Sequence, residues 1–304
     1  MISPGRLWWL LRRDVKRGWD ASYHDYKIKP LITQWTWPFW TEAPMPVPVH
    51  VLTGEKDWQL CAWMLASFFH CTEQTWNVVI HDDGTLTEDT RKQLGAIFKT
   101  ARIIPRAQAD ATIEKTLQPL PFAYEYRGMH PLALKVFDMP YYCEAERFIV
   151  LDSDVLFFKH PREIMDWTAS GAKECWFNED VADASLITET NALDDLGVKL
   201  WPRVNSGLCL IAKEAINYEF CDRALGETSI LKGHLWRVEQ TLFALCASRF
   251  GKGGLLPKGY EVSLGRHAAE DCIARHYVGA VRERFFGEGL KRLGRALLAG
   301  EERG

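Results

Sequence analysis

The stretch RFIVLDSD, at residues 147–154, decides the fold. Residues 148–151 form a continuous apolar run, which is typical of a strand buried on both faces in the centre of a sheet. The run ends at Asp152, and Asp154 follows two positions later. Because residues i and i+2 of an extended chain point to the same side, both carboxylates can face one point beyond the sheet.

Strand and helix patterns alternate along the chain. Short apolar runs at 47–52, 76–80 and 102–104 are separated by helical patterns at 57–70 and 88–100. Further strands are expected at 174–177, 207–212 and 272–278, and further helices at 130–139, 213–225 and 235–249. This alternation predicts an α/β fold with a mostly parallel, Rossmann-like sheet flanked by helices. Ligands of such sheets bind beyond the carboxyl ends of the strands.

Length and composition limit the classes of protein. A chain of 304 residues fits one large domain with extensions, and a net charge of -3 gives no reason to expect a nucleic acid partner. None of the eight cysteines forms a C-x-x-C pair, and several lie in apolar runs. Buried reduced thiols are therefore expected rather than a zinc site or disulfides, which favours a reducing, cytoplasmic location.

The two ends of the chain differ from its body. Residues 1–46 form an extension in which 6–19 make a basic amphipathic helix, with Trp8, Leu11, Val15 and Trp19 on one face. Such a helix either lies on a membrane interface, here the inner membrane face, or packs on its own domain. Both alternatives remain open. Residues 47–286 form the main domain, and residues 287–304 form a basic, helical tail that offers a second membrane contact.

The acidic pair has two possible chemistries. Two adjacent carboxylates repel each other unless a proton or a cation lies between them, and a hard divalent ion that also binds phosphate oxygens meets this need. A phosphatase of the haloacid dehalogenase class is the alternative, with Asp152 as nucleophile. That class needs a further acidic pair, for which Asp194 and Asp195 are available, although they lie in the pattern of a surface helix.

The helix at 235–249 carries an unusual carboxylate. Positions 235, 239, 242, 243 and 246 form one stripe, and all are apolar except Glu239. A carboxylate on a buried stripe is costly unless it is paired or functional. Glu239 or its neighbour Gln240 is therefore a candidate site residue, and the stripe does not decide which.

Several short motifs occur in a fixed order along the chain. They are Thr53-Gly54, Lys135, Asp152-Ser153-Asp154, Asn205-Ser206-Gly207, Glu239-Gln240 and His276-Tyr277-Val278-Gly279. Over residues 47–286 this order resembles the GT-A-fold glycosyltransferases, and most closely the group that contains glycogenin and the bacterial lipooligosaccharide galactosyltransferases.

The resemblance implies a role for each motif. It implies that Asp152, Asp154 and His276 hold Mn²⁺ or Mg²⁺, and that Glu239 or Gln240 acts beside the anomeric carbon, with Asp154 also counted as catalytic. The residues implied in donor binding are Thr53, Gly54, Asp83, Lys135, Asp152, Ser153, Asn205, Gly207, Gly279 and Arg282. Arg282 stands near the place of the family's phosphate-binding lysine, and its guanidinium can bind phosphate through two hydrogen bonds.

The resemblance also implies a reaction. The expected activity is the metal-dependent transfer of a hexose from a UDP-sugar to a hydroxyl acceptor, with retention of configuration. A glycan or a lipid-linked glycan is the expected acceptor. A protein that binds nucleotide sugars without turnover is a third hypothesis.

Overall fold

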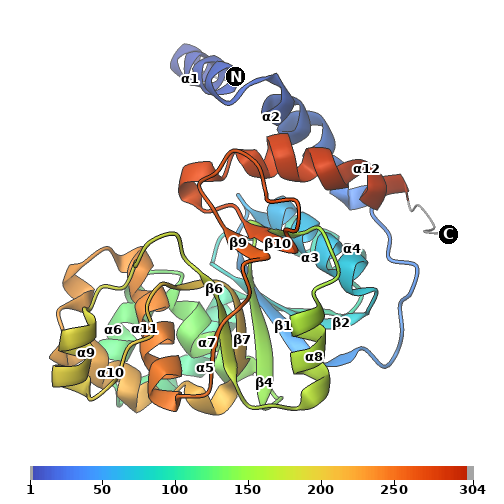
Figure 1. Ribbon diagram of the computed structural model, residues 1–304. Helices are drawn as coiled ribbons and strands as arrows, with labels where there is room; N and C mark the ends of the chain where they lie inside the picture. Colours follow the sequence, from blue (N-terminus) through green and yellow to red (C-terminus); the bar gives the residue numbers. More distant parts are fainter. Residues whose placement is uncertain (1–2, 300–304) are drawn as a thin grey trace.

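A seven-stranded sheet forms the centre of the computed structural model, which describes residues 3–299 (Figure 1). Its first four strands in spatial order are parallel, β7 runs antiparallel to both of its neighbours, and β8 is parallel to β6. In that order the strands are β3 (Ala101–Ile104), β2 (Trp76–Asp82), β1 (Met45–Thr53), β4 (Arg147–Asp152), β7 (Val204–Ala212), β6 (Cys175–Glu179) and β8 (Gly253–Leu255). The predicted α/β fold with a mostly parallel sheet is confirmed.

Alternate residues of β4 enter two different hydrophobic cores. Ile149 and Leu151 pack in a core with α3 (Trp58–Thr72), whereas Phe148 and Val150 pack in a core with α7 (Ala133–Tyr142) and α11 (Leu235–Phe250). The sheet is therefore covered by helices on both faces, which accounts for the uninterrupted apolar run of its central strand. All eight cysteines are free and buried, as the sequence predicts.

The remaining helices connect the strands. They are α4 (Glu88–Ile97), α5 (Arg106–Leu117), α6 (Pro121–Met129), α8 (Arg162–Ser170), α9 (Glu189–Leu196) and α10 (Tyr218–Glu227). The sequence patterns do not predict α5 and α6. The helix expected at 213–225 begins only at Tyr218, because 213–215 form a 3-10 turn and the Asn217 side chain caps the helix that follows.

A second, three-stranded sheet is absent from the sequence prediction. It contains β5 (Val155–Phe157), β10 (Ala274–His276) and β9 (Tyr260–Val262), and β10 lies between the other two. Because β10 pairs with β5 in antiparallel register, His276 lies opposite Val155, directly after Asp154. The small sheet thus joins two segments that are more than a hundred residues apart.

The N-terminal and C-terminal segments lie together at one end of the molecule (Figure 1). The N-terminal segment contains α1 (Pro4–Arg17) and α2 (Trp19–Tyr23), followed by a π-helix at His24–Ile28 and a 3-10 helix at Lys29–Gln34. The C-terminal one contains a π-helix at Phe285–Leu290 and α12 (Lys291–Ala299), whose Leu293 and Leu297 are buried. Asp20 and Lys291 form an ion pair of 2.6 Å between the two segments.

The helix predicted at 6–19 begins and ends two residues earlier, at Pro4 and Arg17. It ends at Arg17, because Gly18 takes a left-handed φ of 89° and Trp19 begins a separate helix. Within residues 3–299, no helix has both the length and the apolar character needed to cross a membrane.

Candidate functional site

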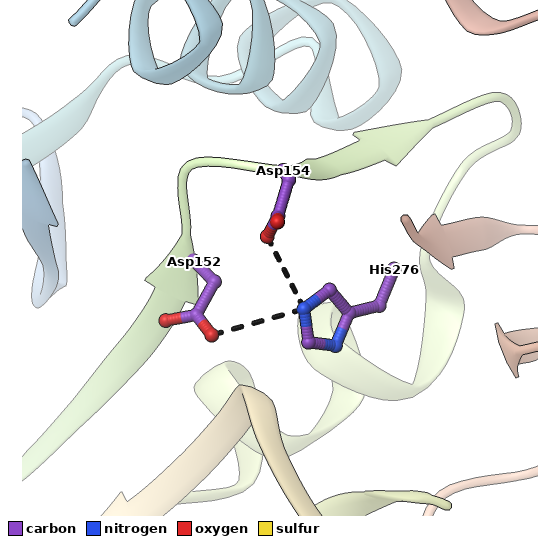
Figure 2. Close-up of side chains that lie close together, drawn as sticks. All are labelled: Asp152, Asp154 and His276. Carbon is purple, nitrogen blue, oxygen red and sulfur yellow. Dashed lines mark ion pairs between the residues drawn. The ribbon is translucent and has the colours of Figure 1, made fainter. Parts of the chain in front are cut away.

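The structure brings Asp152, Asp154 and His276 together (Figure 2). Asp152 ends β4, Asp154 precedes β5, and His276 ends β10. The Nε2 atom of His276 lies 3.2 Å from Oδ1 of Asp154 and 3.8 Å from Oδ2 of Asp152. One ligand atom from each residue lies within 4.8 Å of the other two, which places all three within reach of a single cation.

A second contact fixes the orientation of the His276 ring. Its Nδ1 lies 2.9 Å from the side-chain oxygen of Asn205, which can only accept a hydrogen bond. The network therefore assigns the proton of a neutral ring to Nδ1 and directs the lone pair of Nε2 toward the carboxylates. A Cβ atom on Gly207 would lie 2.2 Å from this Nδ1, so only glycine at 207 leaves room for the imidazole.

The charges around the cluster fit a divalent cation. Burial disfavours a charged His276, but the carboxylates of Asp154 and Asp152 outweigh burial and raise the pKa of the ring. Burial likewise disfavours ionised Asp154, but His276 and Arg282 outweigh it and lower the pKa of this carboxyl. Two ionised carboxylates and an imidazole nitrogen are a donor set that suits Mn²⁺, and carboxylate oxygens also suit Mg²⁺.

Lys135 connects the cluster to α11. Its Nζ lies 2.8 Å from Asp152 and 2.7 Å from Glu239, and it donates a hydrogen bond to the backbone oxygen of Ser206. Burial disfavours the ammonium, but the two carboxylates outweigh it and raise the pKa of Lys135. Glu239 is only 1% exposed and also accepts a hydrogen bond from the Ser206 hydroxyl. The carboxylate on the buried stripe is therefore paired, as its position demands.

A cavity of about 650 Å³ opens beside the cluster. Asp152, Asp154 and His276 line one part of it, and Val278, Gly279 and Ala280 adjoin them. Most of the other lining residues come from the loop after β6, from β7 and from the start of α11, and include Asp180, Asn205, Trp236, Glu239 and Gln240. Acidic and amide side chains thus line the same cavity as the carboxylate pair, and its volume is large enough for a small ligand.

Asp180 is a cavity residue that sequence reasoning missed. Its Oδ2 accepts hydrogen bonds from the side-chain amides of Asn205, at 2.9 Å, and Gln240, at 3.4 Å. Asp180 follows β6, whose last two residues, Asn178 and Glu179, are polar, whereas Asp152 ends a continuous apolar run. The local sequence therefore carries no comparable signal for Asp180.

Some predicted donor-binding residues lie next to the cavity but do not line it. Thr53 is the last residue of β1, which pairs with β4 on one side and β2 on the other, and Gly54 follows it. A Cβ atom on Gly54 would lie 2.1 Å from the Asp83 carboxylate, so these two residues are in close contact. Ser153 is buried and donates a hydrogen bond to the backbone oxygen of Leu52. They extend the edge of the sheet away from the cavity.

Arg282 closes the cluster on the side of α3. Its guanidinium lies 3.3 Å from Oδ2 of Asp154 and 3.0 Å from Asp57, at the start of α3. Gly279, by contrast, has open space where a Cβ atom would lie. A methyl group at position 279 would therefore not clash with the surrounding protein.

Asp194 and Asp195 lie far from this arrangement. Both are exposed on α9, and neither lines the cavity. The second acidic pair that the phosphatase hypothesis requires is thus not supplied by these residues.

Comparison with known proteins identifies the fold. No protein-family model matches the sequence, and no curated protein matches it. Mouse xyloside xylosyltransferase 1, solved in its apo form, superposes with a TM-score of 0.54 at 13% identity, over 77% of this chain and 98% of that one. The galactosyltransferase LgtC, solved with donor and acceptor sugar analogues, gives 0.53 at 13% identity, over 85% and 97%. The chain has the GT-A fold.

In this GT-A fold the strand ends and the cavity form one continuous site. The three possible cation ligands come from β4, from the turn after it and from β10, and the facing side chains come from β7, α11 and the loop after β6. A ligand that carries both an anionic group and a polar hydroxylated group could contact both parts at once.

Proposed function

We propose that the protein transfers a hexose from a UDP-sugar to a hydroxyl group of a glycan or a lipid-linked glycan. The observation that carries this proposal is the cluster of Asp152, Asp154 and His276 in the lining of a cavity that Asp180 and Gln240 also line. The cluster suits a cation-bound diphosphate, and the acidic and amide side chains suit the hydroxyl groups of a sugar. The GT-A fold supports the same reaction class, since the two structural neighbours are a xylosyltransferase and a galactosyltransferase.

The cation would be Mn²⁺ or Mg²⁺, held by Asp152, Asp154 and His276. When bound, it supplies positive charge that stabilises the departing diphosphate. Lys135 holds the Asp152 carboxylate in place through an ion pair of 2.8 Å. Arg282 can exchange its contact with Asp154 for a phosphate oxygen, since a guanidinium binds either anion.

On the sugar side we assign the contacts to Gln240 and Asp180 rather than to Glu239. Gln240 is partly exposed in the cavity, whereas Glu239 is buried and engaged with Lys135 and Ser206. Glu239 is therefore proposed as a positioning residue. Trp236, which is also exposed at the cavity, offers a ring face on which an acceptor sugar can stack. The resemblance of the motif order to the group that contains glycogenin and the lipooligosaccharide galactosyltransferases supports retention of configuration.

The decisive experiment is a panel of sugar donors. UDP-glucose, UDP-galactose, UDP-N-acetylglucosamine and GDP-mannose are incubated with the protein, with and without Mn²⁺ or Mg²⁺, and the released nucleotide is measured. We expect UDP release from a UDP-hexose that requires the metal ion. Release that is independent of metal, or no release from any donor, contradicts the proposal.

The same experiment separates the alternatives. Hydrolysis of an aryl phosphate that is lost in Asp152→Asn would indicate the phosphatase. Stabilisation by UDP without turnover of any donor would indicate a binding protein. The eight buried free thiols favour a reducing compartment. We therefore propose that the protein is located in the cytoplasm.

A further inference from the structure

The first helix of the molecule has its apolar side in solvent. Trp8, Leu11 and Val15 are spaced by three and four residues, so they lie on one side of α1. They are 70%, 54% and 84% exposed, and Trp19, at the start of α2, is 84% exposed. A helix on the surface of a globular domain normally buries such a side against the core. In Figure 1, α1 projects from the end of the molecule that α2 and α12 form.

The polar side of α1 is what holds the helix to the domain. The side chain of Arg17 is only 2% exposed and forms ion pairs of 2.6 Å with Asp25 and 3.2 Å with Glu283. Arg13 donates a hydrogen bond of 2.6 Å to the hydroxyl of Tyr26. These contacts direct the charged side inward, and as a result Trp8, Leu11 and Val15 point away from the protein.

This end of the molecule also carries an excess of positive charge. Residues 1–30 contain seven basic and three acidic residues, whereas the whole chain has a net charge of -3. All three of these acidic residues are already engaged in ion pairs. At this end of the molecule, five exposed cations have no ion-pair partner within the described residues 3–299: Arg12, Lys16, Lys27, Arg292 and Arg295.

We propose that α1 docks on the surface of an anionic lipid bilayer, with Trp8, Leu11, Val15 and Trp19 as the inserted side chains. Tryptophan suits the boundary between headgroups and acyl chains, since its ring is apolar and its indole N–H is polar. The unpaired cations supply the charge complementarity to anionic headgroups. The helix lies in the plane of the interface, because α1 has only 14 residues and spanning the bilayer takes about 20.

A second copy of the chain is the competing occupant of the same surface. It would bring the same unpaired cations and no free carboxylate from residues 1–30. Like charges would then face each other across an apolar contact, which opposes self-association. Charge therefore favours lipid over a dimer. The docking does not depend on the reaction in the cavity.

The test is co-sedimentation of the full-length protein with vesicles. Vesicles of phosphatidylcholine with 30 mol% phosphatidylglycerol are compared with vesicles of pure phosphatidylcholine, at low and at high salt. We expect binding to the anionic vesicles that weakens with salt, because the Debye length shrinks. In W8S/V15S the affinity should fall by at least about tenfold. In R12E/K16E it should fall by more than about fivefold for each reversed charge.

The control is Leu193→Ser on α9, at the opposite end of the molecule (Figure 1), where the side chain is also more than half exposed. It removes exposed apolar surface elsewhere and should leave vesicle binding unchanged. Release of UDP in solution reports that each variant is folded, if the donor panel gives turnover, and circular dichroism reports it in any case. The proposal is overturned if anionic vesicles bind no protein or if L193S weakens binding as much as W8S/V15S. It is also overturned if size-exclusion chromatography shows a dimer that W8S/V15S dissociates.

Discussion

His276 and the pair His50 and His81 are all buried, and they differ in what surrounds them. His276 faces Asp154 and Asp152, which outweigh burial and raise its pKa. His50 and His81 contact each other at 3.0 Å between β1 and β2, next to the ring of Tyr142. No carboxylate of the described part of the chain contributes to their charge state, and burial lowers the pKa of both rings, that of His81 to about 3.

The difference shows that burial alone does not make a histidine functional. A buried histidine without a neighbouring carboxylate stays neutral. The free-energy cost of burying the two neutral rings is offset by packing and by the hydrogen bond that they share. Beside two ionised carboxylates the same side chain becomes a cation or a cation ligand. The cluster around His276 borders the 650 Å³ cavity, whereas neither His50 nor His81 lines it.

The largest expected effect comes from removing one carboxylate at the His276 cluster. Asp154→Ala should lower metal-dependent UDP release by about a thousandfold, because it removes a proposed cation ligand. His50→Gln, in the neutral pair, should leave the rate within about threefold and serves as the control. Rates of nucleotide release at saturating Mn²⁺ compare the two. Full activity in the Asp154 variant would remove the metal assignment.

Lys135→Met tests the paired charges of the cluster. It leaves the carboxylates of Asp152 and Glu239 close together without a cation between them. The free energy of unfolding should fall by about 3 kcal/mol, as for other buried pairs that lose one partner. Urea denaturation gives this value, and the double variant K135M/E239Q should recover part of the loss. If the double variant is no more stable than K135M, the ion pair with Glu239 does not explain the effect.

Two glycines test the room that His276 needs. Gly207→Ala places a Cβ atom against the imidazole, and the displaced ring should weaken Mn²⁺ binding by about 10- to 100-fold. Gly279→Ala meets open space and should leave the affinity unchanged. Titration of Mn²⁺ followed by electron paramagnetic resonance measures both. Equal affinities in the two variants would contradict the ring orientation.

The smallest effect is on stability as a function of pH in EDTA. The unfolded chain protonates His50 and His81 near pH 6.5, while the folded chain takes up the proton on His81 only near pH 3. The stability of the neutral pair is thus present above about pH 6.5 and lost as the pH falls, by about 1.4 kcal/mol per pH unit for each histidine. Denaturation between pH 6.5 and 5 should give a shallower slope in His81→Gln.

The contribution of His276 to stability changes on the other side of pH 6.5. Its raised pKa contributes stability below about pH 6.5, which is lost as the pH rises through the folded pKa. His276→Gln should therefore change the pH dependence above 6.5 and leave the acid side unchanged. The reverse result for the two variants would contradict the assigned charge states.

The sequence predicted the central strand and its carboxylates well, because an apolar run followed by two acidic residues is a local signal. It also placed Asn205, Glu239 and His276 near them through the resemblance of the motif order, and the structure brings all of these residues to one site. What local patterns could not predict was that the strand expected at 272–278, which forms as β10, pairs with β5 and β9 in a separate small sheet. Strands of three residues, such as β5 and β9, are too short for any periodicity.

Other features depend on contacts that only the fold creates. The ion pairs of Lys135 join α7, β4 and α11, and no spacing along the chain indicates them. Helices α5 and α6 were missed although proline stands at the N-terminus of each, at 105 and 121, where it is well tolerated. The side chain of Arg17 points toward the domain because it forms ion pairs with Asp25 and Glu283. Glu283 lies far from Arg17 in sequence, so no local pattern indicates this contact.

The most direct test of a cation-dependent nucleotide-sugar site is the melting temperature of the full-length protein with UDP and Mn²⁺. At ligand concentrations about a hundredfold above the dissociation constant, mass action raises stability by about 2.7 kcal/mol, which shifts the melting temperature by several degrees. We predict this shift for UDP with Mn²⁺, a much smaller shift for either alone, and none in Asp154→Ala. An unchanged melting temperature with UDP and Mn²⁺ together, or an equal shift in Asp154→Ala, would contradict the assignment of the site.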